Sequence, residues 1–284
     1  MHYPLHHRPP HHRDRPGPMT TAPDLAHMDL VALLDDIAAL AVEAGHATLP
    51  FYEGDHGATA KSDGSPVTLA DHAAEAIILP GLARLTPDIP AVSEEAAERG
   101  EIPAVAARLP FWLVDPLDGT KEFIKRNGEF TVNIALVDKG QPVLGVVYAP
   151  ASGELFAGSL APTPLAWRQR NGGEREAIAC RPQPRAGVTV VSSRSHANDE
   201  ALAAYLKSYS VAETLACGSS VKFCRIAEGV ADLYPRFGPT CEWDTAAGHA
   251  VLLAAGGGMT TPEGDPFRYG KAGFRNGPFI AHGK

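Results

Sequence analysis

The chain has 284 residues, of which 44% are hydrophobic and 20% are charged, values typical of a globular protein with one or two hydrophobic cores. Its formal net charge of −8 argues against a protein that coats nucleic acid and suits a pocket that binds cations. No apolar run is long enough to cross a membrane. The cysteines form no paired or zinc-binding motif and predict free thiols in a cytoplasmic protein: Cys180, Cys217, Cys224 and Cys241.

Residues 1–26 differ in composition from the rest of the chain. They are rich in histidine, proline and arginine, hold five of the twelve histidines and contain no apolar segment of the kind that a secretory signal needs. We expect a disordered tail, or translation that starts at Met19 rather than at Met1. A metal-binding tail is the alternative interpretation.

Helical periodicity and apolar runs predict the elements of the first half. Apolar residues at helical spacing begin a helix near Asp29, which Pro50 should kink or end. A polar turn then leads into a second helix at about Thr68. A Lys-Gly-Gln-Pro turn predicts a hairpin between the last two predicted strands. The predicted strands are residues 89–92, 111–115, 130–138 and 143–148.

The second half shows alternating elements after a break. Residues 160–184 lose periodicity and gain proline, glycine and arginine, which marks a candidate boundary. Beyond it we predict strands at 188–192, 211–217 and 232–237, and helices at 199–207, from about 219, and at 243–255. This order predicts an α/β protein whose α+β half precedes an α/β half. We expect a metal-binding part at 27–175 and a part at 176–284 that completes the substrate site.

A strand that ends in a carboxylate-rich turn is the first candidate site. The stretch FWLVDPLDGTKEF, residues 111–123, breaks from an apolar run at Asp115 and passes through Pro116, Asp118 and Gly119. Proline stiffens such a turn and glycine lets it bend, so that two carboxylates and a main-chain carbonyl can converge on a cation. The alternative is a simple turn between two strands.

Further acids occupy comparable positions. Glu94 and Glu95 follow a predicted strand directly, and Asp244 begins an apolar helix. Taken singly, the glutamates could lie in a solvated loop and Asp244 could serve the helix dipole. Together with the aspartate turn they predict a site of hard oxygen ligands, which favours Mg²⁺ or Mn²⁺ over zinc. Two such ions that share a carboxylate suit phosphoryl transfer to water.

These motifs resemble a known family. WLVDPLDGTKEF, the upstream SEE and the downstream WDTAAG are similar to the signatures of the inositol monophosphatase-like, lithium-sensitive phosphatases, a group that includes fructose-1,6-bisphosphatases. KSDGSPVTLAD, SSRSH and GSSVKFCRIAEGVADLYPRFGPT resemble the bacterial 3′(2′),5′-bisphosphate nucleotidases within it. Lys121 and Glu122 stand where inositol monophosphatases usually have a different residue pair. The resemblance implies a layered α-β-α-β-α fold.

The resemblance also implies roles for single residues. Thr120 would help to deprotonate the attacking water, assisted by Asp71, and Glu94 would take part in catalysis. Asp71 could instead only cap its helix, and Lys61 could lie near the site or on the surface. The implied ligands of two or three Mg²⁺ ions, or of Mn²⁺, are Glu94, Asp115, the carbonyl of Leu117, Asp118 and Asp244.

The implied substrate contacts are less constrained by the sequence. Most follow predicted strands, where ligands bind in α/β sheets, but turn and helix-cap chemistry or a surface position would also account for them. His249, on an apolar helix, reads as a core histidine rather than a ligand. Glu242 could touch substrate or face solvent. The implied substrate contacts are Gly119, Thr120, Ser193, Arg194, His196, Gly218, Ser219, Lys222 and Arg236.

The function implied is hydrolysis of the 3′-phosphate of adenosine 3′,5′-bisphosphate to leave AMP, with action on its sulfated form as well. Inositol 1-phosphate and fructose 1,6-bisphosphate are the alternative substrates, because the metal core is shared within the family. A binding regulator with a decayed site is the alternative outside enzymes. A homodimer is common among relatives, and we expect no nucleic-acid polymer as a partner.

Overall fold

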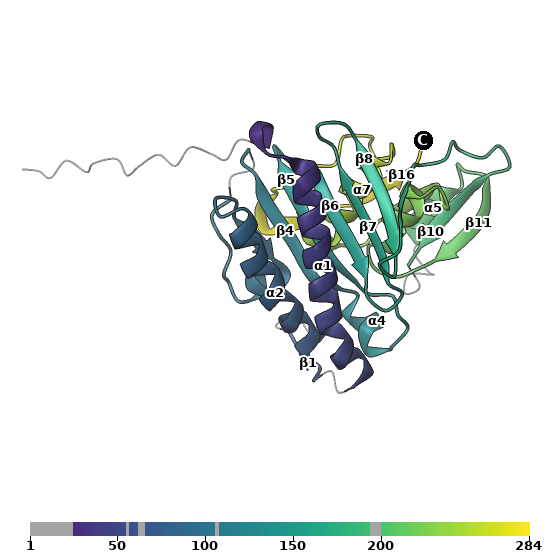
Figure 1. Cartoon of the computed structure of the whole chain (residues 1–284). Helices are drawn as coiled ribbons and strands as arrows, with labels where there is room; N and C mark the ends of the chain where they lie inside the picture. Colours follow the sequence, from purple (N-terminus) through teal and green to yellow (C-terminus); the bar gives the residue numbers. More distant parts are fainter. Residues whose placement is uncertain (1–24, 55–56, 62–65, 106–107, 194–199) are drawn as a thin grey trace, which may run out of the picture.

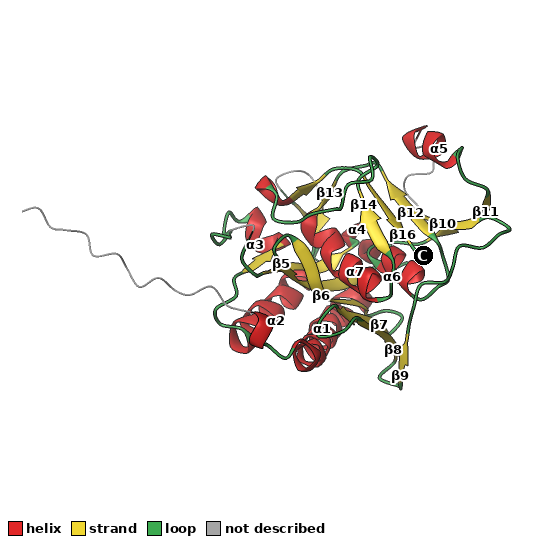
Figure 2. Ribbon diagram, turned by 90° about the horizontal axis from the view of Figure 1, so that it is seen from above, coloured by secondary structure: helices red, strands yellow, loops and turns green. Residues whose placement is uncertain are grey.

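The computed structural model describes residues 25–54, 57–61, 66–105, 108–193 and 200–284. Helices and sheets stack in layers in the order α-β-α-β-α (Figures 1 and 2). Helices α1 (Leu30–Glu53) and α2 (Leu69–Leu85) form the first layer, and α6 (Val221–Ala227) and α7 (Glu242–Ala254) lie between the two sheets. Helix α5 (Glu200–Leu206) forms the last layer. The predicted layered α/β fold is therefore confirmed.

A seven-stranded sheet with the order β3-β4-β5-β6-β7-β8-β9 forms the larger β layer. Adjacent strands of this sheet pair antiparallel, except that β3 and β4 pair parallel. Its strands are β3 Ala91–Ser93, β4 Phe111–Asp118, β5 Thr131–Asp138, β6 Gln141–Ala149, β7 Glu154–Ser159, β8 Leu165–Arg170 and β9 Arg175–Ala177. The smaller sheet has five strands in the order β11 Val211–Ala216, β10 Val188–Ser192, β12 Leu233–Arg236, β16 Phe279–His282 and β14 Gly258–Thr260.

Short elements connect these layers. Two small pairings join β1 to β2 and β13 to β15. The bounds of the short elements are η1 Leu25–His27, β1 Thr59–Ala60, β2 Pro66–Val67, α3 Glu94–Glu98, α4 Thr120–Ile124, β13 Thr240–Cys241, η2 Ala272–Phe274 and β15 Arg275–Asn276.

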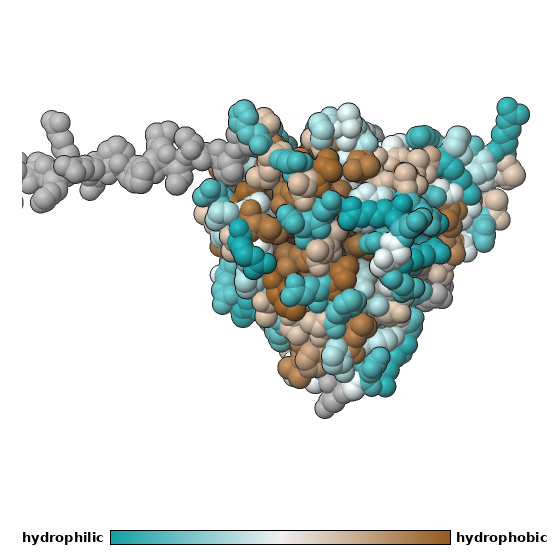
Figure 3. Space-filling model, in the orientation of Figure 1, coloured by the Kyte–Doolittle hydropathy of each residue, from teal (hydrophilic) through white to brown (hydrophobic). Residues whose placement is uncertain are grey.

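Alternation along β4 divides the core into two clusters. Trp112 and Val114 pack with residues of α1 and α2, whereas Phe111 and Leu113 pack with residues of α6 and α7. A strand directs successive side chains to opposite faces, so the period of two places Asp115 on the face that α7 covers. The outer face, over α1, mixes hydrophilic residues with apolar ones (Figure 3), as expected for a helix with one buried side.

Most predicted helix and strand positions agree with the structure within a few residues, and the hairpin between β5 and β6 is confirmed. Asp29 caps α1 by accepting from the amides of Val31 and Ala32 at 3.1 and 3.0 Å. Helix α1 passes Pro50 and ends at Glu53, within one turn of it. The predicted disordered tail was too long, because Leu25 lies in a short 3₁₀ helix and packs against the cluster below α1. Residues 1–24, with Met19, lie outside the described part.

Two strand predictions need correction. The strand predicted to end at Asp115 continues to Asp118, because its pairing with β5 resumes there after an irregularity. The stretch 160–184 contains β8 and β9, which extend the larger sheet although exposed and charged positions hide their alternation. Strand β7 and the C-terminal strands were not predicted either. The division of the chain after residue 175 stays a proposal.

Helix α7 approaches the larger sheet so closely that two strands carry glycine beneath it. A Cβ atom at Gly145 of β6 would lie 2.5 Å from the carbonyl oxygen of Ala247 and 2.7 Å from the Cβ of Ala250. A Cβ atom at Gly158 of β7 would lie 2.8 Å from the Cα of Val251. These distances are shorter than van der Waals contact, and the obstructing atoms belong largely to backbone. The glycines therefore fix how near α7, and the acid at its start, lies to β4.

We predict that Gly145→Ala lowers the free energy of unfolding by about 1–3 kcal/mol, because the added methyl group overpacks against helix backbone. Urea unfolding followed by circular dichroism measures this. Gly277→Ala is the matched control, because a Cβ atom there meets no atom within 4 Å and the backbone is not left-handed. The control should change stability by less than about 0.5 kcal/mol. Equal stability of the two variants would contradict the prediction.

Candidate active site

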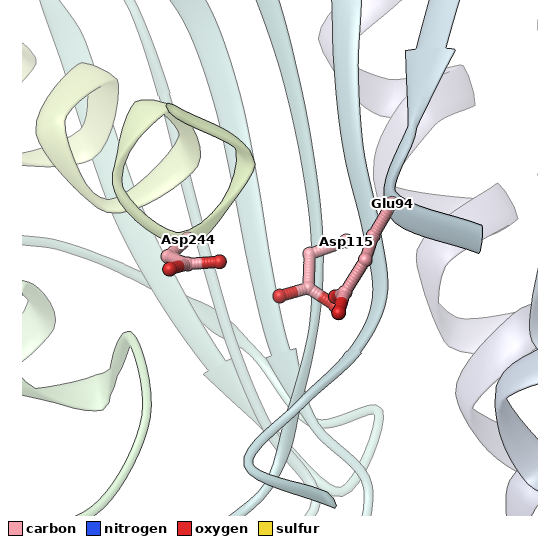
Figure 4. Close-up of side chains that lie close together, drawn as sticks. All are labelled: Glu94, Asp115 and Asp244. Atoms are coloured by element: carbon pink, nitrogen blue, oxygen red, sulfur yellow. The ribbon is translucent and has the colours of Figure 1, made fainter. Parts of the chain in front are cut away.

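Three carboxylates from three separate elements converge between the larger sheet and α7. Glu94 opens α3 directly after β3, Asp115 lies on β4, and Asp244 lies in the first turn of α7 (Figure 4). One oxygen atom from each lies within 4.8 Å of the others. The parallel pairing of Ser93 with Val114 places Glu94 beside Asp115. Glu94 rather than Glu95 is the glutamate of this cluster.

A β-bulge adds Asp118 to the same face. Asp115 pairs with Asn133 and Asp118 pairs with Thr131, so β4 uses one residue more than β5 over this span. The extra residue restores the phase of the alternation and directs both aspartates towards α7. The amide of Leu117 donates to Asp115 Oδ1 at 3.1 Å, which stabilises the bulge. Proline and glycine in the motif thus shape a bulge in a continuing strand.

Burial and repulsion dominate the electrostatics of the cluster. Burial raises the pKa of Asp115 well above its ordinary value, and the nearby charges of Glu94, Asp118 and Asp244 raise it further. Burial and the charges of Asp118 and Glu94 act in the same way on the pKa of Asp244. Burial also raises the pKa of Asp118, although Lys222 and a hydrogen bond from Ser220 act in the opposite direction. A multivalent cation with a preference for oxygen ligands would relieve this repulsion, so the donor set fits such an ion.

Lys61 pairs directly with the glutamate of this cluster. Its Nζ lies 2.7 Å from Glu94 Oε1 and 2.6 Å from Glu95 Oε1, and its side chain is 4% exposed. The surface position considered for Lys61 is therefore wrong. Burial opposes protonation, but Glu94 and Glu95 raise the pKa of Lys61 above its ordinary value. Burial raises the pKa of Glu95 to about 7, while Lys61 acts in the opposite direction.

Asp71 uses its two carboxylate oxygens for different partners. Oδ2 accepts from the amide and the hydroxyl of Thr68 at 2.8 and 2.7 Å, which completes the capping box of α2. Oδ1 lies 3.3 Å from the hydroxyl of Thr120, at the start of α4. Burial raises the pKa of Asp71, while the Thr68 hydrogen bonds lower it. Both interpretations of Asp71, as a cap and as a partner of Thr120, agree with this geometry.

Asp244 repeats this arrangement on α7. One of its oxygens, Oδ2, accepts from the amide of Cys241 at 2.7 Å and caps the helix, while the carboxylate also belongs to the acidic cluster. The other acid of this turn, Glu242, is fully buried and touches neither substrate space nor solvent. It accepts from the amides of Gly270 and Lys271 at 2.8 and 2.9 Å and pairs with the Lys271 ammonium at 2.7 Å. Glu242 therefore holds the loop at Gly270 and Lys271 in place. The expectations that it touches substrate or faces solvent were both wrong.

A cavity of about 260 Å³ opens beside the acids. Lys222 and Arg236 also line this cavity, and their side chains form no ion pair with any carboxylate in the described part of the chain. The Nε of Arg236 is buried and has no hydrogen-bond partner among the described residues. Of the predicted substrate contacts, Gly119, Ser193, Gly218, Ser219, Lys222 and Arg236 line this cavity together with Asp118, Lys121, Glu122 and Asp244. Arg194 and His196 lie outside the described residues.

The sequence interpretation missed three residues that support or line the site. Glu75, one turn after Asp71 on α2, accepts from the Ser93 hydroxyl at 2.6 Å and the Ala96 amide at 3.0 Å, on either side of Glu94. Its spacing of four from Asp71 was an available signal. Tyr234 lines the cavity and Asn133 contacts Ser220 beside the acids, and no local pattern assigned a role to Tyr234 or Asn133. Ser220 itself follows a predicted strand and was considered as a substrate-loop residue or a helix cap. His249 is buried against Tyr269, and burial lowers its pKa to about 3, which agrees with a core histidine.

Comparison with known proteins identifies the family. A model of the inositol monophosphatase family matches residues 31–282. The chain belongs to this family. The 3′(2′),5′-bisphosphate nucleotidase CysQ of Escherichia coli strain K12 is 49% identical over 239 residues, which cover 84% of this chain and 94% of that protein. The protein of the same name from Buchnera aphidicola is 44% identical over 88% of this chain and 93% of its own length.

Solved structures support the same conclusion. The crystal structure of CysQ from Bacteroides thetaiotaomicron matches with a TM-score of 0.73 at 39% identity and covers 90% of this chain and 99% of that one. An inositol monophosphatase from Anabaena matches with a TM-score of 0.70 at 26% identity. The predicted family and fold are thus confirmed. Within the described residues, no helix combines the length and the apolar character needed to span a bilayer.

We predict that Asp115→Asn stabilises the cation-free protein, because it removes one of several charges that repel one another in a buried site. The melting temperature in EDTA should rise by a few degrees, since about 1 kcal/mol shifts it by roughly 2–4 °C in proteins of this size class. We expect Mg²⁺ to stabilise the unmodified protein, and the variant should lose most of that stabilisation. Asp36→Asn, at an exposed position of α1, is the control and should change neither value. A lower melting temperature of Asp115→Asn in EDTA would refute the repulsion argument.

Proposed function

We propose that this protein is a Mg²⁺-dependent phosphatase that removes the 3′-phosphate of adenosine 3′,5′-bisphosphate and releases AMP and phosphate. The observation that carries the proposal is a cavity that is lined both by acids of the cluster and by two cations, Lys222 and Arg236, for which the described residues supply no carboxylate partner. A substrate with two phosphates could place one against each. The names of relatives that are 44–49% identical over most of the chain state this nucleotidase activity.

The ligands that would hold Mg²⁺ are the carboxylates of Glu94, Asp115, Asp118 and Asp244 and the carbonyl of Leu117. Mg²⁺ prefers hard oxygen donors at octahedral geometry, and all five donors are oxygen atoms. Bound divalent cations supply charge neutralisation for the phosphoryl oxygens and lower the pKa of a water molecule. Two or three ions are proposed, as in our sequence interpretation, and these five donors would hold them.

Thr120 and Asp71 would handle the proton of the attacking water. The Thr120 hydroxyl lies 3.3 Å from Asp71 Oδ1 and 3.4 Å from the carbonyl of Leu117, so it is held at the turn that bears the ligands. A threonine hydroxyl is a weak base alone and needs a carboxylate to receive a proton. Because burial raises the pKa of Asp71, this carboxylate is a better proton acceptor than an exposed aspartate. In this scheme water attacks directly, and no side chain becomes phosphorylated.

The second phosphate would bind at the cationic part of the cavity. Lys222 is buried, with its Nζ 5.4 Å from the ring centroid of Tyr234, and Arg236 presents a buried nitrogen that lacks a described partner. The amides of Gly119 and Thr120 would contact the phosphate that is cleaved. Ser193, Gly218 and Ser219 would contact the nucleoside, together with Arg194 and His196. Lys121 and Glu122 line the same cavity and would help to distinguish a nucleotide from an inositol phosphate.

A cytoplasmic location and a homodimer complete the proposal. The four cysteines form no disulfide with one another, and three of them are buried, which suits a reducing compartment. The homodimer follows from the family resemblance alone, and light scattering coupled to size exclusion would measure it. The sulfated form of adenosine 3′,5′-bisphosphate is proposed as a second substrate.

Side-by-side phosphate release from adenosine 3′,5′-bisphosphate, inositol 1-phosphate and fructose 1,6-bisphosphate tests the substrate. We expect the highest kcat/KM with the adenosine compound. Arg236→Met should lower that value at least about tenfold, because a charge-assisted contact of roughly 1.5–3 kcal/mol is lost. Activity on adenosine 3′-monophosphate, which lacks the second phosphate, should change much less with this variant. Faster turnover of inositol 1-phosphate would show that the substrate assignment is wrong.

Thr120→Ala tests the proton-transfer role. We expect kcat to fall by about 10²–10⁴, the usual range for loss of a positioned acid–base group, with little change in KM. Thr120→Ser is the matched control, since it keeps the hydroxyl that faces Asp71, and it should retain most activity. If Thr120→Ser is as impaired as Thr120→Ala, the methyl group rather than the hydroxyl matters and the proposed role fails.

A further inference from the structure

The hydroxyl of Ser220 joins three polar groups beside the acidic cluster. Its Oγ lies 3.0 Å from Asp118 Oδ2, 2.8 Å from the carbonyl oxygen of Asp244 and 2.8 Å from Asn133 Nδ2. Ser220 is 1% exposed and Asn133 is fully buried. These residues come from β4, β5, α7 and the residue that precedes α6, so one hydroxyl connects four elements of the fold.

The direction of each hydrogen bond follows from the inventory of donors. The amide nitrogen of Asn133 donates to Ser220 Oγ. The single hydroxyl hydrogen of Ser220 is then available for either the Asp118 carboxylate or the Asp244 carbonyl. A charged acceptor forms the stronger bond, so an ionised Asp118 holds the hydroxyl and is held by it. The two hydrogen bonds therefore have the same direction: Asn133 donates to Ser220, and Ser220 donates to the Asp118 carboxylate.

Ser220 does not act as an ordinary helix cap. It precedes α6 with φ −72° and ψ −7°, a helical conformation, and its side chain makes no capping hydrogen bond. Its hydroxyl points instead towards Asp118 and α7, away from the amides that a cap would satisfy. Ser220 precedes the helix that carries Lys222. It therefore connects this cation of the cavity to the acids.

The position of Asn133 adds a second observation. Asn133 is the cross-strand partner of Asp115, and both side chains lie on the face covered by α7. Its amide oxygen is buried and has no hydrogen-bond partner among the described residues, although its amide nitrogen is satisfied. A buried amide that uses only its donor side and lies next to a carboxylate cluster is costly for packing alone. It is well placed to orient the surroundings of a bound cation.

We propose that Asn133 and Ser220 are positioning residues of the cation site, which set the direction of the Asp118 carboxylate and the seat of the first turn of α7. The pair acts through the ligands rather than on the substrate. It raises cation affinity because the aspartates are held in place before the cation arrives. This inference rests on the cation site of the proposed function but concerns residues to which that function gives no role.

Isothermal titration with Mn²⁺ or Mg²⁺ of the purified full chain, first stripped with EDTA, tests the proposal. Ser220→Ala should weaken cation affinity about ten- to hundredfold, the range for residues that orient metal ligands. Asn133→Leu, which keeps the branched shape and removes the donor, should weaken it less because Ser220 still donates to Asp118. Ser220→Thr restores a hydroxyl and should recover affinity relative to Ser220→Ala.

Ser159→Ala is the matched control, because it deletes a fully buried hydroxyl from β7 of the same sheet, one that donates to the Ala161 carbonyl. Its cation affinity should equal that of the unmodified protein, and circular dichroism in EDTA confirms that every variant is folded. Unchanged affinity in both Ser220→Ala and Asn133→Leu overturns the inference, as does an equal loss in Ser159→Ala. If the unmodified protein binds no divalent cation, the proposed function itself fails. If it binds and turns over substrate while the variants match it, only the present inference fails.

Discussion

Several carboxylates lie in one buried place, and their mutual repulsion is the constraint that the surrounding fold has to counter. Burial and neighbouring charges raise the pKa of Asp115 and Asp244 in the protein without a cation. Loose loops would relax such repulsion by moving the acids apart. Here the acids lie on a central strand, at the start of a helix packed over glycines, and at a strand end held by a buried glutamate. The rigidity of these elements keeps the ligands together before a cation binds.

Two carboxylates of the site have a structural role in addition to the chemical role proposed for them. Asp71 and Asp244 each give one oxygen to a helix cap, while Asp71 also faces the Thr120 hydroxyl and Asp244 also belongs to the acidic cluster. The capping hydrogen bond to a backbone amide fixes one oxygen of the carboxylate, and this also orients the second oxygen. Lys61 adds one positive charge against Glu94 and Glu95 and leaves the remaining negative charge to be balanced by an ion. Structural and chemical roles therefore coincide in these residues rather than compete.

Local sequence patterns predicted the parts of the molecule whose causes are local. Helical spacing, a capping box and a hairpin turn placed α1, α2 and the β5–β6 pair, and a strand followed by acids indicated Glu94 and Asp115. The bulge at Leu117 was not predictable, because it depends on pairing with β5. Strands β8 and β9 were missed since their exposed, charged positions hide the alternation. Asn133, Ser220 and the buried role of Glu242 depend on contacts between residues far apart in the chain, which no window of sequence contains.

The distance along the chain between the acids has a consequence for how the molecule folds. Asp115 and Asp244 are separated by well over a hundred residues, and they meet only when α7 settles on the larger sheet. Contacts of such high sequence separation form late, after the hairpins and the α1–α2 pair that need only short loops to close. The electrostatic penalty is therefore expected near the end of folding, and a bound divalent ion would act chiefly by slowing the departure of α7 from the native state. The ion would then lower the unfolding rate by linking two segments that are far apart in the chain, in addition to its proposed part in the reaction.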